Sequence, residues 1–525
     1  MREADPMPFI QIYDTTLRDG TQSEGFTLSA HSKIRLAQRL DDLGVAFIEG
    51  GWPGSNPKDA EFFERARDLE WRTALIAAFG STCRVKGGPE DDANIHALID
   101  SQAPVCTIFG KTWTLHVTDV LLTTLDDNLR IIEQSVAHLR AAGRRVIYDA
   151  EHFFDGYRAD PLYALETLKA AIRGGAETLV LCDTNGGTMP WDVERIIAEM
   201  RQAVDHPFGI HTHNDSECAV INALLAVRQG ATQVQGTING VGERCGNANL
   251  CSIMANLELK MGRQCLPEGR LHRLYEISHV VDEVANITPN DHLPYVGKSA
   301  FAHKGGVHVA AMRRSEQSYQ HVAPERVGNR MRVVVSALSG RANILSKAEE
   351  HGVDVASVAD VVGVLNDVKE LEARGFSFEA AEASVAMMLK RQQPGYQAPF
   401  ELIDFLVNVE HRQGRGTFAE AMVKVRVNDE VLHTAAEGNG PVNALDIALR
   451  KALLGHFPEI ASFQLADYKV RILDGQDGTE AITRVLIDTR SNTRTWSTVG
   501  ASANIIEASW QALVDAIEYG LSLVH

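Results

Sequence analysis

The motif His-Thr-His-Asn-Asp at residues 211–215 carries the plainest chemical signal in the sequence. It ends an apolar run, residues 208–213, that has the pattern of a short β-strand. Residues i and i+2 of a strand point to the same side, so we expect the imidazoles of His211 and His213 to lie together. Two imidazoles beside a carboxylate suit a divalent cation that keeps open coordination positions. The motif therefore predicts a metal site at a strand end.

Seven further short runs resemble this strand, and amphipathic stretches separate them. The eight runs are residues 9–13, 46–49, 74–79, 105–109, 146–148, 178–182, 208–213 and 232–237. Helical spacing at 30–43 and 160–173 is followed by Gly44 and Gly174, the residue type that favours helix C-caps. Eight strand and helix units in about 250 residues predict a (β/α)₈ barrel. A doubly wound sheet is the rival, but no strand is followed by the phosphate-binding pattern G-x-G-x-x-G.

Polar residues cluster at the ends of these runs, where a (β/α)₈ barrel places its active site. They are Asp14, Arg18 and Asp19, then Glu49, then Asp149, Glu151 and His152, then Asp183, Thr184 and Asn185, and last Asn239, Glu243 and Asn247. Tyr148, the final residue of the fifth run, is predicted to contact the substrate. Asp14 is expected to shape its loop, because aspartate commonly caps turns and helices. One mouth is thus predicted to hold imidazoles, carboxylates and an arginine.

The composition restricts the possible partners. The chain has 525 residues, of which 51 are Lys or Arg and 69 are Asp or Glu, so the formal net charge is −18. This balance argues against nucleic acid or an anionic membrane as the main partner. No stretch approaches the roughly 18 apolar residues of a membrane span. The 7 cysteines include no C-x-x-C pair, so we expect reduced thiols and a cytoplasmic protein.

Beyond the barrel the pattern changes twice. Residues 1–265 are predicted to form the barrel, 266–399 a helical linker subdomain and 400–525 a separate α+β domain. The turn-rich segment 392–399 marks the second boundary. After it, alternating runs at 418–427 and 468–473 predict strands, and 444–454 and 504–519 predict helices. The predicted fold class is therefore α/β, a barrel followed by a linker and a C-terminal α+β domain.

Several longer motifs resemble one enzyme family. They are DTTLRDGTQ (14–22), IEGGWPGS (48–55), HTHND (211–215) and GTINGVGERCGNANL (236–250) in the barrel, AHKGGVH (302–308) in the linker, and GNGPVNAL (438–445) and GASANIIEAS (500–509) near the end. Together they resemble the acetyl-CoA-dependent synthases that condense 2-oxo acids, the 2-isopropylmalate, homocitrate and citramalate synthases of the DRE-TIM metallolyase superfamily. The resemblance spans nearly the whole chain and implies an acyltransferase with a C-terminal allosteric domain.

The resemblance also implies a metal site and its occupant. Asp19, His211 and His213 would ligate a divalent ion, with Asn247 in or near its shell. Mg²⁺, Mn²⁺ and Zn²⁺ all suit this ligand set. No choice among the three follows from the sequence.

Roles for the substrates follow from the same resemblance. Arg18 would clamp the 2-oxo acid and stabilise the alkoxide that forms on its keto oxygen, Thr184 would hold its carboxylate, and Glu49 would orient Arg18. A base must take a proton from the acetyl methyl group of acetyl-CoA. The candidates are Glu151, or His308 with Tyr319, which the resemblance places over the barrel of a partner subunit in a homodimer.

Two segments narrow the substrate. DAEHFFDGY (149–157) and LCDTNGGT (181–188) are most similar to the citramalate-forming branch, whereas Thr21 departs from the acidic or amide residue more common in 2-isopropylmalate synthases. That branch joins acetyl-CoA to pyruvate on the way to 2-oxobutyrate and isoleucine, which makes isoleucine the expected effector. The alternatives are a synthase for a larger 2-oxo acid, an acyl-CoA lyase on the same metal site, and a non-catalytic amino-acid sensor.

Overall fold

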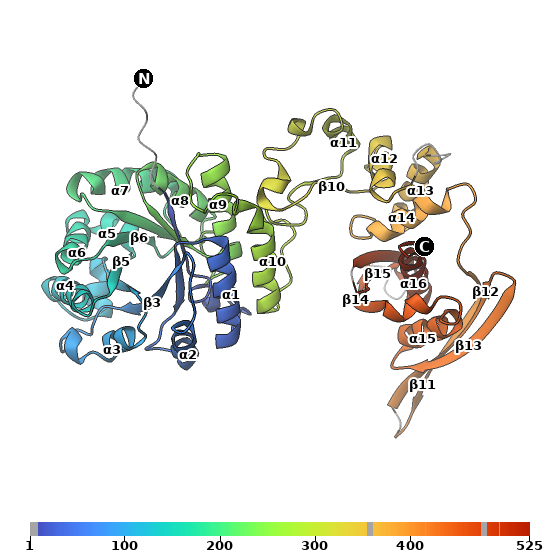
Figure 1. Cartoon of the computed structure of the whole chain (residues 1–525), viewed down its shortest axis with the longest axis horizontal. Helices are drawn as coiled ribbons and strands as arrows, with labels where there is room; N and C mark the ends of the chain where they lie inside the picture. The colour runs from blue at the N-terminus through green and yellow to red at the C-terminus, as the bar shows by residue number, and fades with distance from the viewer. Residues whose placement is uncertain (1–8, 354–360, 415, 474–479, 493, 525) are drawn as a thin grey trace. The chain divides into compact units, whose positions relative to one another are not determined.

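Eight parallel strands form a closed barrel in the computed structural model, which describes residues 9–353, 361–414, 416–473, 480–492 and 494–524 (Figure 1). The strands are β1 Gln11–Asp14, β2 Phe47–Gly51, β3 Leu75–Ser81, β4 Val105–Lys111, β5 Arg145–Glu151, β6 Thr178–Asp183, β7 Phe208–Thr212 and β8 Gln233–Gly236. Each strand pairs with the next, and β8 returns to β1 with Val234 opposite Ile12. The predicted (β/α)₈ barrel and its eight strands are confirmed.

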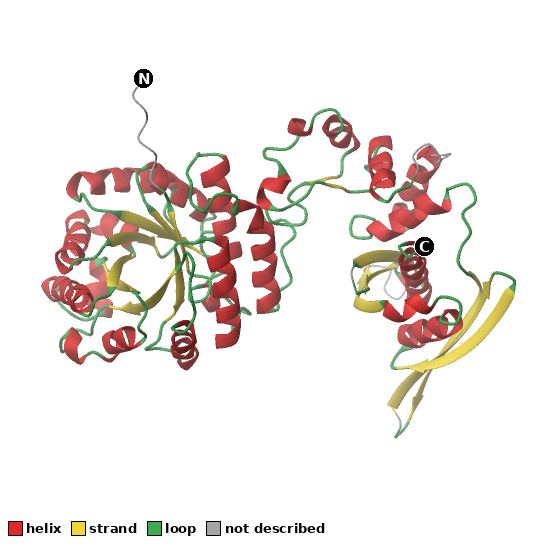
Figure 2. Ribbon diagram, viewed as in Figure 1, coloured by secondary structure: helices red, strands yellow, loops and turns green. Residues whose placement is uncertain are grey.

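Helices surround the barrel strands (Figure 2). They are α1 Ala30–Leu43, α2 Pro57–Ala66, α3 Ala93–Asp100, α4 Leu125–Ala141, α5 Phe153–Ala159, α6 Pro161–Gly174, α7 Pro190–Ala203, α8 Ala219–Arg228, α9 Leu250–Leu259 and α10 Leu274–Ala285. α1 has the predicted bounds, with a Ser29 N-cap and Gly44 at φ 99° as its C-cap. The prediction of Gly174 as a cap is wrong by one residue, because Gly175, at φ 95°, takes the left-handed conformation that ends α6.

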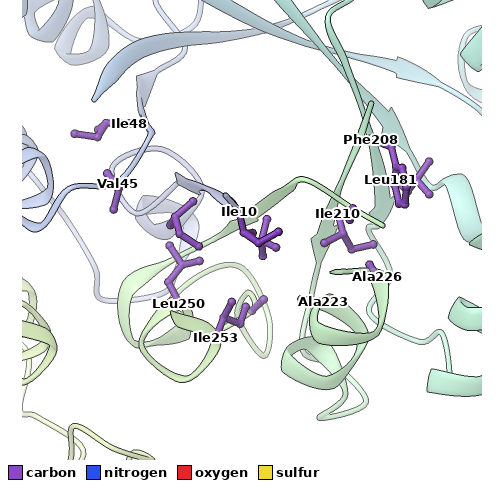
Figure 3. Close-up of a cluster of buried hydrophobic side chains, with 14 of the residues drawn as sticks. Ile10, Val45, Ile48, Leu181, Phe208, Ile210, Ala223, Ala226, Leu250 and Ile253 are labelled. Atoms are coloured by element: carbon purple, nitrogen blue, oxygen red, sulfur yellow. The ribbon is translucent and has the colours of Figure 1, made fainter. Parts of the chain in front are cut away.

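The barrel strands face two different cores. The larger core lies between strands and helices, where Ile10 and Ile210 meet Ala223 of α8 and Leu250 and Ile253 of α9 (Figure 3). A smaller cluster contains Tyr13, Val105, Ile147 and Val180, each of which alternates along its strand with a residue of the larger core. Since neighbouring strand residues point to opposite faces, the smaller cluster fills the barrel interior. This alternation decides which side chains can reach the mouth.

The chain forms two compact units. The first ends at Phe301 and also includes Val322–Arg330, and the second comprises Ala302–His321 and the residues from Met331 onward. The second unit starts with two short paired strands, β9 Ala302–His303 and β10 Arg332–Val333, and with the helices α11 Gly306–Met312, α12 Arg341–Glu350, α13 Val361–Ala373 and α14 Glu382–Arg391. The three-part division at residues 265 and 399 stays a prediction.

The rest of the second unit repeats one pattern, three antiparallel strands followed by a helix. The first copy is β11 Glu401–Arg412, β12 Gly416–Val427, β13 Glu430–Gly438 and α15 Pro441–Leu453, and the second is β14 Gln464–Ile472, β15 Thr483–Arg490, β16 Thr495–Ser502 and α16 Ile505–Ser522. The predicted α+β domain is thus confirmed. Among the described helices, none is both long and apolar enough to cross a membrane.

Candidate active site at the barrel mouth

A cavity of about 220 Å³ opens among the carboxyl ends of the barrel strands. Its walls are Arg18, Asp19, Gln22, Trp52, Phe79, Phe109, Asp149, Glu151, Cys182, Thr184, His211, His213, Glu243 and Arg244. Most of these residues end a strand or follow one within a few positions. The parallel sheet therefore collects residues far apart in sequence at one mouth, as expected for this fold.

Asp19, His211 and His213 lie together as a group that could hold a metal ion. Asp19 Oδ2 is 3.4 Å from His211 Nε2 and 4.0 Å from His213 Nε2, and the two Nε2 atoms are 3.3 Å apart. All three residues are buried, with exposed fractions of 2%, 6% and 6%. His211 lies on β7, His213 directly follows the end of β7, and Asp19 lies in the loop after β1.

Electrostatics in this group favour a cation. Burial lowers the pKa of His211 to about 4 and lowers that of His213, so both imidazoles are neutral and offer lone pairs. Burial works against ionisation of Asp19, but the guanidinium of Arg18 beside it holds its pKa below the ordinary value. Three buried atoms here have no hydrogen-bond partner among the described residues: Asp19 Oδ1, His213 Nδ1 and Asn247 Oδ1. Of these atoms, the two oxygens are unpaired buried acceptors, which fit a bound cation.

His211 is held from behind by two further polar residues. Its Nδ1 lies 3.0 Å from Gln235 Oε1 on β8, and Gln235 Nε2 donates to Asp149 Oδ1 at 3.0 Å on β5. Gln235 is fully buried and Asp149 is 4% exposed. These contacts leave Nε2 of His211 as the nitrogen that faces Asp19.

Arg18 is fixed on two sides. Its Nε donates to Glu49 Oε1 at 2.6 Å, and Glu49 Oε2 accepts from the Tyr13 hydroxyl at 2.7 Å. The guanidinium carbon lies 3.7 Å from the centre of the Phe79 ring, a cation–π contact. Although burial opposes it, Glu49 and Asp19 raise the pKa of Arg18 above its ordinary value. A permanently charged, oriented guanidinium therefore lines the cavity beside the Asp-His-His group.

Thr184 and Glu151 complete the polar wall. The Thr184 hydroxyl accepts from the His152 backbone N–H at 2.9 Å, which leaves its own hydrogen for another acceptor. His152 reaches this position in a left-handed conformation, with φ 56°, which is uncommon for a residue other than glycine. Glu151 forms an ion pair with Lys111 of β4.

Three other residues predicted from the sequence lie elsewhere. Tyr148 is fully buried in the core between strands and helices, because it points to the opposite face of β5 from Asp149, and it does not line the cavity. His308 of α11 and Tyr319 belong to the second unit, where their rings stack with centroids 4.3 Å apart. The roles assigned to all the predicted site residues stay predictions.

In and behind the cavity lie residues to which the sequence analysis gave no role, although it placed Asp149 at the mouth. Asp149 and Gln235 support His211, and Phe79 stacks on Arg18. Arg244 donates to both carboxylate oxygens of Asp215, at 2.8 and 3.0 Å, and to the Thr184 carbonyl at 2.8 Å. Two features of the sequence could have identified these residues. Arg244 lies inside the motif at 236–250, and Asp149 lies two positions before Glu151, on the same face of a strand.

Three family models match successive parts of the chain. HMGL-like matches residues 9–281, the homocitrate synthase post-HMGL domain-like model matches 295–375, and the LeuA allosteric (dimerisation) domain matches 379–521. The barrel and its mouth lie within the first match, and the repeated strand-and-helix pattern lies within the third.

Relatives match over nearly their full length. The (R)-citramalate synthase of Geobacter sulfurreducens is 52% identical over 98% of this chain and 98% of its own, and that of Synechocystis sp. is 50% identical over 98% and 96%. A probable 2-isopropylmalate synthase of Methanopyrus kandleri is 31% identical over 97% of both chains. The chain belongs to the HMGL-like enzymes and, within them, to the (R)-citramalate synthase family. It is an acyltransferase, as that membership entails.

Proposed function

We propose that this protein condenses acetyl-CoA with pyruvate and hydrolyses the resulting thioester to give citramalate and CoA. Its 52% identity to an (R)-citramalate synthase across almost the whole chain carries the proposal. The cavity at the barrel mouth offers the charged groups that such a condensation needs. The larger-acceptor alternative has weaker support, since the 2-isopropylmalate relative is only 31% identical.

Asp19, His211 and His213 hold a divalent cation in this proposal, with Asn247 beside them. A bound Mg²⁺, Mn²⁺ or Zn²⁺ ion would supply Lewis-acid polarisation of the keto group. The unpaired atoms Asp19 Oδ1 and Asn247 Oδ1 support an ion at this position.

Arg18 and Thr184 bind the acceptor. The guanidinium of Arg18, oriented by Glu49, points a fixed positive charge at the keto oxygen, where negative charge grows as the new carbon–carbon bond forms. Thr184 donates its hydroxyl hydrogen to the acceptor carboxylate, because a carboxylate only accepts and the hydroxyl oxygen is oriented by the His152 N–H that it accepts. Phe79, Phe109 and Trp52 form an aromatic wall of the cavity, with their rings packed against one another.

Removal of the acetyl methyl proton requires a base, and Glu151 is the candidate inside the cavity. The proton moves to the base while the C–H electron pair forms the enolate, which attacks the keto carbon; the keto π electrons become the alkoxide that Arg18 stabilises. Water then cleaves the thioester. His308 with Tyr319 is the alternative base, contributed by the second subunit of a homodimer.

The acceptor assay tests the reaction directly. Purified protein with Mg²⁺ or Mn²⁺ is given acetyl-CoA and, side by side, pyruvate, 2-oxobutyrate, 2-oxoisovalerate or 2-oxoglutarate, and free thiol release is followed. We expect pyruvate to give the highest kcat/KM. Preference for 2-oxoisovalerate or 2-oxoglutarate would replace the proposal with a sister synthase, and no release with any acceptor would favour the lyase or the sensor.

Isoleucine is the proposed effector, and the C-terminal domain its binding region. The match to a LeuA allosteric (dimerisation) domain at 379–521 supports both a regulatory and a dimerising role. Inhibition curves of the full-length protein with isoleucine, leucine and valine should show isoleucine as the strongest inhibitor. Equal insensitivity to all three would leave the domain with a dimerising role only, which sedimentation measurements would test separately.

A further inference from the structure

The two nitrogens of His211 have different neighbours. Nε2 faces the candidate metal group, 3.4 Å from Asp19 Oδ2, while Nδ1 lies 3.0 Å from an oxygen of Gln235. A carbonyl oxygen can only accept a hydrogen bond, so Nδ1 must carry the hydrogen. Nε2 then keeps its lone pair, as a metal ligand requires.

The orientation of the Gln235 amide decides this tautomer. If the amide were turned over, its NH₂ group would donate to Nδ1, the hydrogen would move to Nε2, and no lone pair would face Asp19. Asp149 selects the observed orientation, because its Oδ1 accepts from Gln235 Nε2 at 3.0 Å. The hydrogen bonds therefore run in one direction, from His211 through Gln235 to Asp149.

The barrel holds this chain of three residues rigidly. Gln235 is the direct register partner of His211 across β7 and β8, and Asp149 reaches the amide from β5. All three side chains are nearly or fully buried, so water does not compete for the same hydrogen bonds.

We propose that Gln235 and Asp149 are positioning residues that hold His211 in its Nδ1–H tautomer and thereby set the affinity of the Asp19, His211 and His213 group for a divalent cation. The proposal rests on the metal site of the proposed function. Outer hydrogen-bond partners of this kind typically change metal affinity by about 10- to 100-fold.

Gln233 is a matched control on the same strand. It lies two residues before Gln235, is also fully buried, and shares its face of β8. Neither its Oε1 nor its Nε2 has a hydrogen-bond partner among the described residues. Replacing Gln233 by leucine thus imposes the same change of size and polarity without touching His211.

The experiment measures binding of Mn²⁺ alone to the full-length protein, with free Mn²⁺ followed by electron paramagnetic resonance. We expect Gln235→Leu to weaken binding by about 10- to 100-fold and Gln233→Leu to change it by less than about twofold. Gln235→Glu keeps an acceptor for Nδ1–H but places two carboxyl groups together, so we expect it to lose less Mn²⁺ affinity than Gln235→Leu. Adding Asp149→Asn to Gln235→Glu restores a donor between them and should recover most of the affinity.

The outcomes separate the two proposals. Wild-type protein that binds no Mn²⁺ would remove the metal site itself. Wild-type binding with equal affinity in Gln235→Leu would overturn the positioning role and leave the metal site standing. Equal losses in Gln235→Leu and Gln233→Leu would also overturn it, since a general packing effect would then explain both. Thermal unfolding of each variant identifies any that fails to fold, and the Glu and double variants then decide.

Discussion

Each of the two units holds a cluster of charged side chains, buried at the barrel mouth and partly exposed around Arg391 in the second unit, and the clusters differ in how completely their polar atoms are paired. At the barrel mouth, Asp19 Oδ1 and His213 Nδ1 are buried without hydrogen-bond partners among the described residues. In the second unit, Arg391 of α14 bonds Asp515 Oδ1 at 2.7 Å and Glu518 Oε2 at 2.5 Å, and Ser384 donates to Asp515 Oδ2 at 2.6 Å. The first cluster, called the open cluster below, contains polar atoms without hydrogen-bond partners. In the second, called the closed cluster, both acids are hydrogen-bonded.

This difference separates function from structure. Burying a polar atom without a hydrogen-bond partner costs about 1 to 3 kcal/mol, and a cation bound at the barrel mouth would remove that cost for Asp19 Oδ1. The paired cluster needs no ligand and instead fastens α14 to α16. Buried charge alone therefore does not mark a functional site; the barrel mouth differs because unpaired acceptor oxygens lie beside two neutral imidazoles.

The largest expected effect is on the open cluster. His213→Ala removes one of three candidate ligands and should lower acetyl-CoA and pyruvate turnover by about 10³-fold or more. Steady-state CoA release, measured beside Mn²⁺ binding, checks this. His96→Ala, at an exposed histidine, is the control. Full activity in His213→Ala would refute the metal assignment.

Arg18→Lys should have the next largest effect, about 10²- to 10³-fold on kcat. Lysine keeps the positive charge but cannot donate to Glu49 and also stack flat on Phe79. The measurement is kcat and KM for pyruvate. A change in KM with unchanged kcat would assign Arg18 to ground-state binding of the acceptor.

A smaller effect is expected from opening the closed cluster. Arg391→Met leaves Asp515 and Glu518 buried without their cation and should destabilise the second unit by about 2 to 4 kcal/mol. Burial raises the pKa of both acids while Arg391 opposes it, so the folded state favours their protonated forms. The stability of the variant should therefore fall as pH rises above about 4.

Denaturant unfolding of Arg391→Met at several pH values provides the measurement. Arg426→Met is the control, because Arg426 pairs with Glu401 at 2.7 Å in an exposed position, where a salt bridge contributes about 0 to 1 kcal/mol. Equal losses in the two variants would contradict the contrast between a pair whose acids are largely buried and a pair that is exposed on both sides.

The smallest effect concerns Asp14, which lies five residues before Asp19. Both carboxylate oxygens of Asp14 accept hydrogen bonds, whereas Asp19 Oδ1 has no partner among the described residues. Burial raises the pKa of Asp14 to about 7, although its two hydrogen bonds from Thr16 act in the opposite direction. The folded pKa exceeds the unfolded one, so the stability contribution is complete below about pH 4 and is lost as pH rises toward 7. Between pH 5 and 7 the wild type should lose about 1 to 2 kcal/mol relative to Asp14→Asn. Parallel pH slopes of unfolding would show that Asp14 does not titrate in this range.

Much of the barrel could be predicted because its signals are local. Runs of apolar residues, helix caps and polar strand ends all lie within a few positions of one another, and α1 has its predicted bounds. The same rule of alternation brought His211 and His213 together. The preference for glycine at helix C-caps placed the end of α6 one residue too early, since Gly174 and Gly175 are adjacent and either could end the helix.

Tyr148 marks the limit of local reasoning. Alternation along β5 means that Tyr148 and Asp149 face opposite ways, but the sequence does not say which of the two faces inward. The barrel decides it: Tyr148 packs in the outer core, and Asp149 reaches the cavity. A shift of one residue exchanges the faces of a strand, so the choice of face places Tyr148 outside the cavity, while its role stays a prediction.

The sequence by itself determined the eight strand and helix units, the polar strand ends and the paired histidines, because periodicity and residue type act over short distances. Only the tertiary structure decided which polar atoms are paired. Gln235 supports His211 and Arg391 joins Asp515 through contacts between residues 24 and 124 positions apart. Closure of the barrel and packing of α14 on α16 bring these residues together, and no local pattern encodes that distance.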